Sequence, residues 1–264
     1  MLIGAAFGSF VNVVVYRLPQ GISLLWPPSH CPACKSRLGM TENVPVLGWL
    51  WLGGRCRHCG AAIHWRYPLV EAVGATLFGL VAWKMQASFL TPASFIDVAA
   101  WGCLVALLLA LSLIDLDTME LPDELTRAGI LGGLLFRTFG PVLVTGMWAS
   151  GPPGLMDGLY GLLLGLGLFD LIGYLGERLL GKEAMGGGDA KLAAMLGVWL
   201  GWQGLLVALG IGFCLGAVVG VVGLATGQLK REQAFPFGPF LACGGIAGLL
   251  FGETLIASYL RLIY

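Results

Sequence analysis

The stretch from Ala184 to Leu196, AMGGGDAKLAAML, places three glycines and an acid directly before a long apolar run. Glycine lowers helix stability and frees the backbone, so Gly186, Gly187 and Gly188 predict a tight turn or a close approach of two backbones. An acid at the mouth of an apolar segment is costly and therefore needs an explanation. Asp189 is the first candidate functional residue.

The apolar run is one of many in this chain. Of its 264 residues, 57% are hydrophobic and 11% are charged, whereas soluble domains have about 25% charged residues. A helix needs roughly 20 apolar residues to cross a bilayer, and runs of that kind recur throughout. The 42 glycines suit closely packed membrane helices. A net charge of zero gives no indication of nucleic-acid binding.

We expect the apolar runs to form eight membrane helices. The expected spans are residues 1–16, 67–85, 98–114, 125–145, 156–176, 191–207, 209–226 and 237–257. The sixth and seventh are separated only by a short turn, GWQG, that begins at Gly201. The predicted fold class is an all-α polytopic membrane protein with about eight transmembrane helices.

Lysine and arginine predict the orientation, because positively charged loops stay on the cytoplasmic side. Twelve of the 15 lysines and arginines lie in four loops or at the helix edges beside them. These loops are residues 17–66, 115–124, 177–190 and 227–236. We expect them in the cytoplasm. The chain then divides into a first transmembrane helix (1–16), a cytoplasmic loop domain (17–66) and a transmembrane bundle (67–264).

The cytoplasmic insert carries four cysteines in a regular pattern. Cys31 and Cys34, then Cys56 and Cys59, form two C-x2-C pairs separated by 21 residues. Two such pairs complete a tetrahedral four-thiolate zinc site, which has no open position and is therefore structural. An insert this small has little core, so a metal would stabilise it. Disulfides are the alternative, which a cytosolic location disfavours.

Two acids occur where apolar spans meet cytoplasmic loops. Asp115 ends one span and Asp189 begins another, so the expected topology places both at the same membrane face. Two carboxylates in a partly dry cleft can share a proton, one activating water while the other protonates a carbonyl. Either acid alone is also explained as a cap or a solvated charge. Asp117 is the nearest rival to Asp115, and Asp123 and Glu124 suit a helix N-terminus.

Further motifs, in order along almost the whole chain, carry a resemblance to one family. The matching stretches are GSFVNVVVYRLP at residues 8–19, the four cysteines, RYPLVE at 66–71, GGGD at 186–189 and PFGPFLA at 236–242. Asp115 lies seven residues before Pro122, as in a D-x6-P-[DN] element. The chain resembles the type IV prepilin peptidases, which are membrane aspartic proteases with a G-x-G-D signature. Seven residues precede Gly8, fewer than in most members.

The resemblance implies a multi-pass enzyme of the bacterial inner membrane with two activities. It cleaves the leader from type IV prepilins or type II secretion pseudopilins at the cytoplasmic face, and methylates the new N-terminal amine with S-adenosylmethionine. The expected site residues are the catalytic pair Asp115 and Asp189, the hinge glycines Gly186, Gly187 and Gly188, and the zinc ligands Cys31, Cys34, Cys56 and Cys59. Expected partners are substrates with a basic leader and an apolar helix, and the lipid bilayer, but no nucleic acid.

Some roles rest on weaker arguments. The weaker candidates for contact with the substrate or the methyl donor are Ser9, Asn12, Arg17, Asp117 and Lys191. No G-x-G-x-x-G with a following acid locates the donor. A helix N-terminus favours an anion and a C-terminus disfavours one. We therefore expect Asp189 to be ionised and to hold the attacking water, and Asp115 to donate the proton.

Two other classes of function fit parts of the sequence. In a proton-coupled carrier, Asp115, Asp170 and Asp189 would relay protons, but such a carrier does not explain the cysteine-rich insert. A zinc-stabilised assembly scaffold would tolerate the loss of both acids. Incubation of the purified protein with a prepilin separates the three classes, because only the peptidase yields a shortened, methylated product.

Overall fold

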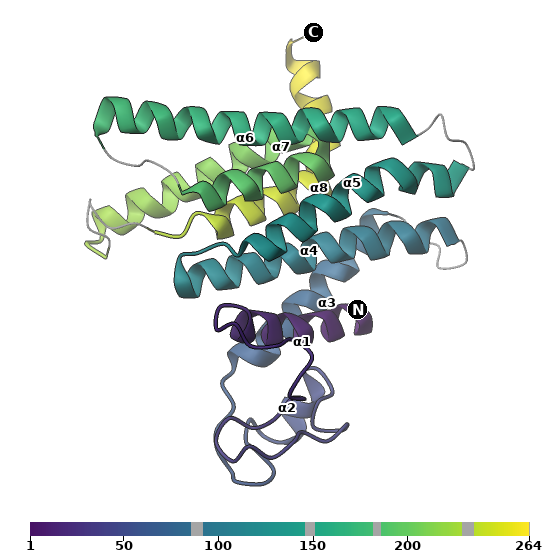
Figure 1. Cartoon of the computed structure of the whole chain (residues 1–264), viewed down its shortest axis with the longest axis vertical. Coiled ribbons are helices and arrows are strands. Elements are labelled where there is room, and N and C mark those ends of the chain that lie inside the picture. Colours follow the sequence, from purple (N-terminus) through teal and green to yellow (C-terminus); the bar gives the residue numbers. More distant parts are fainter. Residues whose placement is uncertain (86–91, 146–150, 182–185, 229–234, 264) are drawn as a thin grey trace. The chain divides into compact units, whose positions relative to one another are not determined.

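The computed structural model describes residues 1–85, 92–145, 151–181, 186–228 and 235–263. Its helices are α1 (Leu2–Arg17), α2 (Leu47–Trp51), α3 (Arg66–Lys84), α4 (Pro92–Thr118), α5 (Asp123–Thr145), α6 (Gly151–Leu180), α7 (Gly187–Ala225) and α8 (Gly238–Ile263) (Figure 1). The described residues form no strand, only two isolated β-bridges. The expected all-α class is confirmed. Three of the positively charged residues in the expected cytoplasmic loops, Lys182, Lys230 and Arg231, lie outside the described residues.

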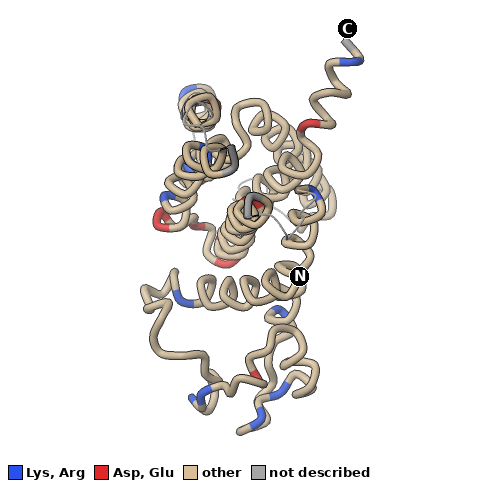
Figure 2. Tube along the Cα trace, turned by 90° about the vertical axis from the view of Figure 1, so that its right-hand side faces the viewer, with Lys and Arg blue, Asp and Glu red and all other residues tan. Residues whose placement is uncertain are grey.

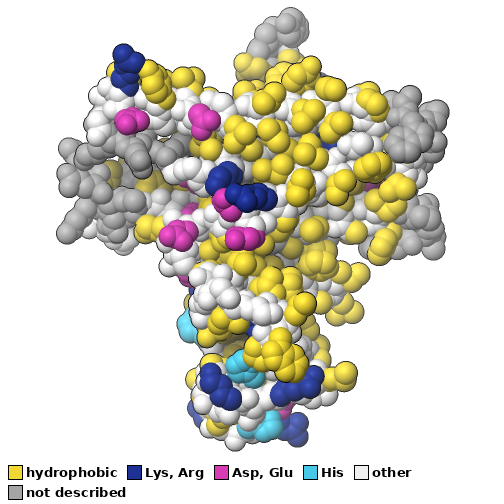
Figure 3. Space-filling model, in the orientation of Figure 1, with side chains coloured by type: hydrophobic (Ala, Val, Ile, Leu, Met, Phe, Trp, Pro, Cys, Tyr) yellow, Lys and Arg dark blue, Asp and Glu magenta, His cyan; other side chains and the backbone are white. Residues whose placement is uncertain are grey.

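Four helices are long and apolar enough to cross a membrane, among the residues that the structure describes. They are Ser94–Thr118, Gly151–Leu179, Gly187–Ala225 and Gly238–Leu262, and the shorter α1 is also apolar. Lysines, arginines and acids are sparse along these helices (Figure 2), and hydrophobic side chains cover much of the visible face of the helices (Figure 3). The chain is a multi-pass membrane protein.

The chain divides into two compact units, residues 1–110 and 111–264. In the first unit α1 packs directly on α3 through glycines. A Cβ added at Gly4 would lie 2.6 Å from the carbonyl oxygen of Gly74, so the two backbones touch. The rings of Phe7 and Phe78 stack beside this contact, with centroids 5.0 Å apart. Small residues at such contacts are typical of membrane helices.

In the second unit α7 consists of two helices joined at Gly201, where φ is 75° and ψ is 173°. This backbone conformation suits only glycine. An added Cβ would also lie 2.0 Å from Oδ2 of Asp157, so that carboxylate would have to move. The turn expected at Gly201 is therefore present. The expected boundaries were less accurate, because the first half of α7 ends at the break and not at residue 207.

The two halves of α7 run in opposite directions (Figure 1). The first half runs antiparallel to α6, with Gly197 against Gly161 and Ala193 against Gly165. Phe169 lies one turn beyond Gly165 on α6. Its ring stacks on the ring of Phe213 in the second half of α7, with the ring centroids 6.0 Å apart. Residue 213 therefore lies near the start of α7. A 39-residue helix would be roughly 58 Å long, about twice the thickness of the bilayer core. The reversal allows two passes.

The second half of α7 runs antiparallel to α8. A Cβ added at Gly244 would lie 2.1 Å from the carbonyl oxygen of Ala208, and one added at Gly212 would lie 3.3 Å from Cα of Leu241. The start of α8 therefore returns to the end of the bundle where α7 begins.

Arg137 links three helices at the opposite end, where α7 reverses. From α5 it donates to the carbonyl oxygens of Val198 (3.1 Å) and Trp199 (2.8 Å) of α7. Its guanidinium also lies 3.3 Å from the carboxylate of Asp157 on α6. These contacts satisfy carbonyl groups that a helix leaves without partners at its C-terminal end.

Candidate active site and metal centre

Asp115 lies in the last turn of α4 and is only 5% exposed. Its Oδ2 atom accepts a hydrogen bond of 2.8 Å from the backbone N–H of Gly238, the first residue of α8. A buried carboxylate needs such a donor, because an unpaired buried charge is expensive. The hydrogen bond fixes the side chain of Asp115 at the N-terminus of α8.

Asp189 lies in the first turn of α7, half-buried, with its backbone N–H 3.1 Å from the carbonyl oxygen of Gly186. Its carboxylate lies within electrostatic range of Asp115. The structure therefore brings together the two acids that the topology had placed at one membrane face. Asp117, two residues from Asp115, is exposed. Burial thus distinguishes Asp115 from its nearest rival.

The glycines before Asp189 do not adopt a left-handed backbone conformation. Gly186 is extended, with φ −75° and ψ 144°, and Gly187 begins the helix. A Cβ on Gly188 would lie 3.0 Å from Cβ of Leu121, whereas one on Gly187 would meet no atom within 4 Å. Among the three glycines only Gly188 is therefore in close contact, and a Cβ on Gly186 would lie at an ordinary contact distance of 3.8 Å from Oδ2 of Asp189. Their role as a hinge stays a prediction.

Gly238 is a site residue that the sequence reasoning missed. A Cβ there would lie 2.7 Å from Oδ2 of Asp115, closer than real Cβ contacts. Gly238 contributes its backbone N–H, and its lack of a side chain leaves room for the carboxylate of Asp115. Neither property belongs to a reactive side chain that a sequence motif search would single out. The sequence pointed to Gly238 only through its position in PFGPFLA, one of the stretches by which the chain resembles the prepilin peptidases.

The hydrogen bond of Gly238 also changes the argument from helix ends. We expected Asp115 to be disfavoured as an anion because it ends α4. In the structure it also faces the N-terminal amide of α8, a favourable place for an anion. Both acids therefore lie at helix N-termini, and helix ends no longer decide which of them is the proton donor.

Four rings form an apolar wall at the start of α8. Phe237 lies 5.3 Å from Phe213 and 6.4 Å from both Phe169 and Phe240, measured between ring centroids. Because Phe237 directly precedes Gly238, this wall lies beside Asp115. An apolar substrate segment would find a matching surface there.

Lys191 pairs with another helix at the same end of the bundle. Its Nζ lies 2.5 Å from Oδ1 of Asp123 at the start of α5, and Arg127 contacts the other carboxylate oxygen at 2.9 Å. The hydrogen bond and charge of Lys191, with a smaller contribution from Arg127, lower the pKa of Asp123. Asp123 and Glu124 occupy the first turn of α5, as expected. Asp170, considered for a proton relay, is exposed on α6.

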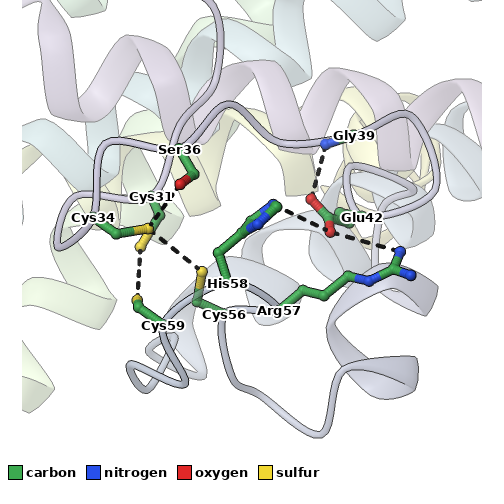
Figure 4. Close-up of polar contacts among 9 residues, drawn as sticks. All are labelled: Cys31, Cys34, Ser36, Gly39, Glu42, Cys56, Arg57, His58 and Cys59. Atoms are coloured by element: carbon green, nitrogen blue, oxygen red, sulfur yellow. Dashed lines mark hydrogen bonds and ion pairs between the residues drawn. The ribbon is translucent and has the colours of Figure 1, made fainter.

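The four cysteines converge in the loop between α1 and α3 (Figure 4). All four sulfur atoms lie within 4.8 Å of one another, with Cys31 3.9 Å from Cys59 and Cys34 4.0 Å from Cys56. A tetrahedron of zinc–sulfur bonds about 2.3 Å long separates its sulfurs by about 3.8 Å. A disulfide needs about 2.05 Å, so the geometry fits the metal and not the alternative.

Two equivalent turns hold these sulfurs. In the first, the N–H of Lys35 donates to the carbonyl oxygen of Cys31, and in the second Gly60 donates to Cys56, both at 2.9 Å. Lys35 and Gly60 have positive φ, 58° and 72°. His58 lies instead 3.9 Å from Glu42 (Figure 4), so it contacts a carboxylate outside the sulfur cluster.

The thiols favour a bound cation. Hydrogen bonds from the side chain and backbone of Ser36 lower the pKa of Cys34 to about 6. Backbone N–H groups of Cys59 and His58 lower the pKa of Cys56. For Cys59, a backbone hydrogen bond from Ala61 lowers the pKa, but burial and the other thiols raise it to about 11. Crowded thiols thus resist full ionisation, and a divalent cation would remove that repulsion.

Three weaker candidates lie on α1. Asn12 donates to the carbonyl oxygen of Tyr67 (3.1 Å), and Ser9 forms a hydrogen bond with Glu71. Glu71 also accepts a 2.6 Å hydrogen bond from the N–H of Val46 in the cysteine loop. Ser9 and Asn12 therefore bind α1 to α3. Arg17 differs, because it is only 6% exposed and lines a pocket.

Comparison with known proteins gives the family. The model of the Bacterial Peptidase A24 N-terminal domain matches residues 2–85, and that of the Type IV leader peptidase family matches residues 102–221. A protein named prepilin leader peptidase/N-methyltransferase from Aeromonas salmonicida is 38% identical, over 99% of this chain and 93% of its own length. The chain belongs to the type IV leader peptidase family.

Other members of the family show similar sequence identity and coverage. The proteins of that name from Pseudomonas aeruginosa and Burkholderia pseudomallei are 38% and 39% identical, over 99% and 96% of this chain and 92% and 84% of their own lengths. No solved structure matches the chain. The leader peptidase match contains Asp115 and Asp189 but ends before Gly238, and the N-terminal match contains all four cysteines.

Proposed function

We propose that this chain is a bifunctional membrane enzyme. It removes the leader peptide from type IV prepilins or type II secretion pseudopilins, and then N-methylates the new N-terminal residue. The names of the relatives support both activities. The observation that carries the peptidase proposal is a buried Asp115, held by the N-terminal amide of α8 and within electrostatic range of Asp189.

In the proposed cleavage, one carboxylate of the pair removes a proton from water while the other protonates the carbonyl oxygen of the scissile peptide. The resulting tetrahedral centre then collapses: the carboxyl group that took the proton from water gives it to the departing amine, and the hydroxyl group formed from the carbonyl returns its proton to the other carboxylate. The amide of Gly238 keeps one oxygen of Asp115 fixed throughout, so the other oxygen faces the reaction. The exposed glycines Gly186 and Gly187 carry no side chain that would obstruct an extended substrate strand.

The substrate would enter with its apolar helix along the phenylalanine wall formed by Phe169, Phe213, Phe237 and Phe240. Its basic leader would lie near the exposed acids Asp117, Glu120 and Glu124. The active site would lie at the cytoplasmic face of the bacterial inner membrane, as the positive loops indicate.

For the second activity, S-adenosylmethionine would supply an electrophilic methyl group. The cleaved substrate would supply its free N-terminal amine, which loses a proton as the nitrogen–carbon bond forms. Zinc would be held by Cys31, Cys34, Cys56 and Cys59 and would be structural, since four protein thiolates leave no open position. Residues 17–66 would form this metal-binding domain, between a first helix (1–16) and the peptidase bundle (67–264).

The test uses purified protein in nanodiscs, a prepilin substrate, and intact-mass detection of the shortened and methylated products. Asp115→Asn and Asp189→Asn each should reduce cleavage by about 10²–10⁴-fold or more, the usual contribution of acid–base catalysis. Asp170→Asn is the matched control, because the same change is made on an exposed side chain of α6 that the proposal does not use. Wild-type cleavage by either of the first two variants would refute the dyad.

A further inference from the structure

A pocket of about 350 Å³ lies in the first unit, where the apolar helix α1 ends and the cysteine loop begins. Phe10, Val13 and Arg17 of α1 form one wall, and their spacing of three and four residues places them on one face of the helix. The opposite wall comes from loop residues within 24–29 and 37–43. An arginine at the end of an apolar membrane helix lies at the level of the lipid headgroups. The pocket therefore opens near the membrane surface.

The pocket carries two positive charges and no negative one. Arg17 is 6% exposed, and one N–H of its guanidinium donates to the carbonyl oxygen of Ser23 (3.0 Å). Arg37, on the opposite wall, is exposed. A guanidinium has five N–H donors in a planar fork that suits a carboxylate or a phosphate. Residues 1–85 are all described, and no aspartate or glutamate among them lines the pocket. The charges favour an anion that brings no cationic group with it.

An excess of positive charge extends over the whole loop. Residues 17–66 contain six lysines and arginines but a single acid, Glu42 (Figure 2). Glu42 is engaged within the loop, because its carboxylate accepts a hydrogen bond from the N–H of Gly39 (2.8 Å) and lies 4.0 Å from Arg57. A zinc ion bound by four thiolates would add two negative charges and still leave a positive excess. Basic residues grouped beside a membrane helix attract an anionic lipid surface.

The rim of the pocket is apolar and exposed. Leu25 and Met40, which line the pocket, are 88% and 96% exposed, and Trp26 beside Leu25 is 73% exposed. Large apolar side chains grouped on a surface mark contacts with a membrane or another protein. Tryptophan in particular is enriched at the headgroup level of a bilayer. A polar, positive pocket with an apolar rim matches a lipid, whose headgroup is charged and whose chains are not.

The volume and the polar side chains narrow the choice of lipid. About 350 Å³ lies at the lower end of the range for small-molecule sites, so a headgroup fits inside while the acyl chains remain outside. Ser29 and Asn43 line the pocket with a hydroxyl and an amide, which suit the hydroxyl groups of a glycerol headgroup. An ethanolamine headgroup would place an ammonium beside two arginines, without a carboxylate to pair with it. S-adenosylmethionine is disfavoured for the same reason, since its sulfonium and ammonium outnumber its one carboxylate.

The first cysteine turn belongs to the same wall. The N–H of Leu38 donates to the carbonyl oxygen of Ser29, and the N–H of Cys31 donates to that of Ser36, both at 2.9 Å. Residues 29–38 therefore form a closed turn, with pocket residues at its two ends and the first two cysteines between them. A ligand in the pocket would hold this turn against α1.

We propose that the pocket binds the phosphate group of an anionic phospholipid of the phosphatidylglycerol type, between Arg17 and Arg37, with the acyl chains over Leu25 and Met40. The lipid would fasten the cysteine loop to the end of α1 and to the membrane surface. The inference does not depend on the peptidase or methyltransferase activity. It gives Arg17 a role in lipid binding, in place of the expected contact with the substrate or the methyl donor.

The test titrates the full chain, purified and delipidated in detergent, with dioleoyl phosphatidylglycerol and measures the first bound lipid by native mass spectrometry. Arg17→Gln should weaken binding about tenfold or more, the loss expected for hydrogen bonds to a charged group. Arg37→Gln should weaken it about two- to fivefold, as expected for an exposed charge pair. Arg55→Gln is the matched control, an exposed arginine of the same loop outside the pocket, and should bind like wild type. Dioleoyl phosphatidylethanolamine should bind the wild type about tenfold more weakly or worse, because its ammonium faces like charges.

Variants are compared at equal zinc content and equal melting temperature. Weaker binding by Arg17→Gln and Arg37→Gln, with Arg55→Gln unchanged, supports the site. If Arg17→Gln does not fold, because Arg17 also contacts Ser23, the exposed Arg37 decides the result. Wild-type affinity in the pocket variants overturns the proposal, as does equal affinity for the two lipids. Inorganic phosphate is the second arm: if it displaces the lipid at an equal concentration, the pocket takes a free anion and the lipid is refuted as its ligand. None of these outcomes changes the proposed function, which is measured by cleavage and methylation.

Discussion

Replacement of Gly238 by alanine tests whether the start of α8 holds Asp115. The new Cβ would lie 2.7 Å from Oδ2 and 3.2 Å from Cγ of Asp115. Neither distance is tolerable without movement. The carboxylate must therefore rotate away or α8 must shift, and either movement breaks the 2.8 Å hydrogen bond from the Gly238 N–H.

The expected magnitude follows from that bond. A hydrogen bond to a charged group contributes about 1.5–3 kcal/mol, and Asp115 is too buried for water to replace the donor. At 1.36 kcal/mol for each factor of ten, leader cleavage by Gly238→Ala should fall roughly 10- to 150-fold. The loss should appear in kcat more than in KM, because substrate-binding surfaces are unchanged.

The assay is cleavage of a purified prepilin under single-turnover conditions, with wild type and variants at equal melting temperature. Gly252→Ala is the matched control, the same change in the same helix where a new Cβ meets no atom within 4 Å. We expect wild-type rates from it. A Gly238→Ala enzyme within twofold of wild type would show that the contact with Asp115 does not matter for catalysis.

Two further changes test other parts of the molecule. Cys31→Ser should lower bound zinc from one per chain to well below one and reduce the melting temperature, measured by elemental analysis and thermal unfolding. Cys103→Ser, at an exposed cysteine outside the cluster, should change neither, and equal zinc in both variants would contradict the four-thiolate site. Lys191 lowers the pKa of Asp123 below its usual value near 3.9, so their pairing stabilises the fold above about pH 4 and is lost as the pH falls through the lowered pKa. Asp123→Asn should therefore melt below wild type at pH 7, with a gap that closes toward pH 3, and a gap independent of pH would argue against this pairing.

Much of the framework was predictable because it depends on local pattern. Apolar runs predicted the helices, and glycine at position 201 predicted the reversal within α7. The spacing of the cysteines predicted their convergence. The approach of Asp115 and Asp189 followed from topology alone, since each lies where a span meets a loop on the same side.

The remainder depends on contacts between distant segments. Gly238 donates through its backbone to a residue 123 positions earlier, and a backbone N–H leaves no mark in the amino-acid type. The helix-end argument does not decide between the two acids for the same reason, because it considered α4 without the helix that packs against its end. The role of Arg137 required the positions of carbonyl groups on α7, which no periodicity encodes.

Arg137 determines which end of the bundle of residues 111–264 separates most easily. It ties α5, α6 and α7 together where α7 reverses, through two hydrogen bonds to backbone carbonyl groups of α7 and an ion pair with Asp157 of α6. At the opposite end, α5 and α7 are joined by the partly exposed pair of Asp123 and Lys191, and exposed ion pairs of this kind contribute little to stability. Separation of α5 from α7 is therefore easiest at the end that carries Asp115 and Asp189. If the proposed substrate helix enters between these two helices, we expect it to enter at that end while the Arg137 contacts hold the other.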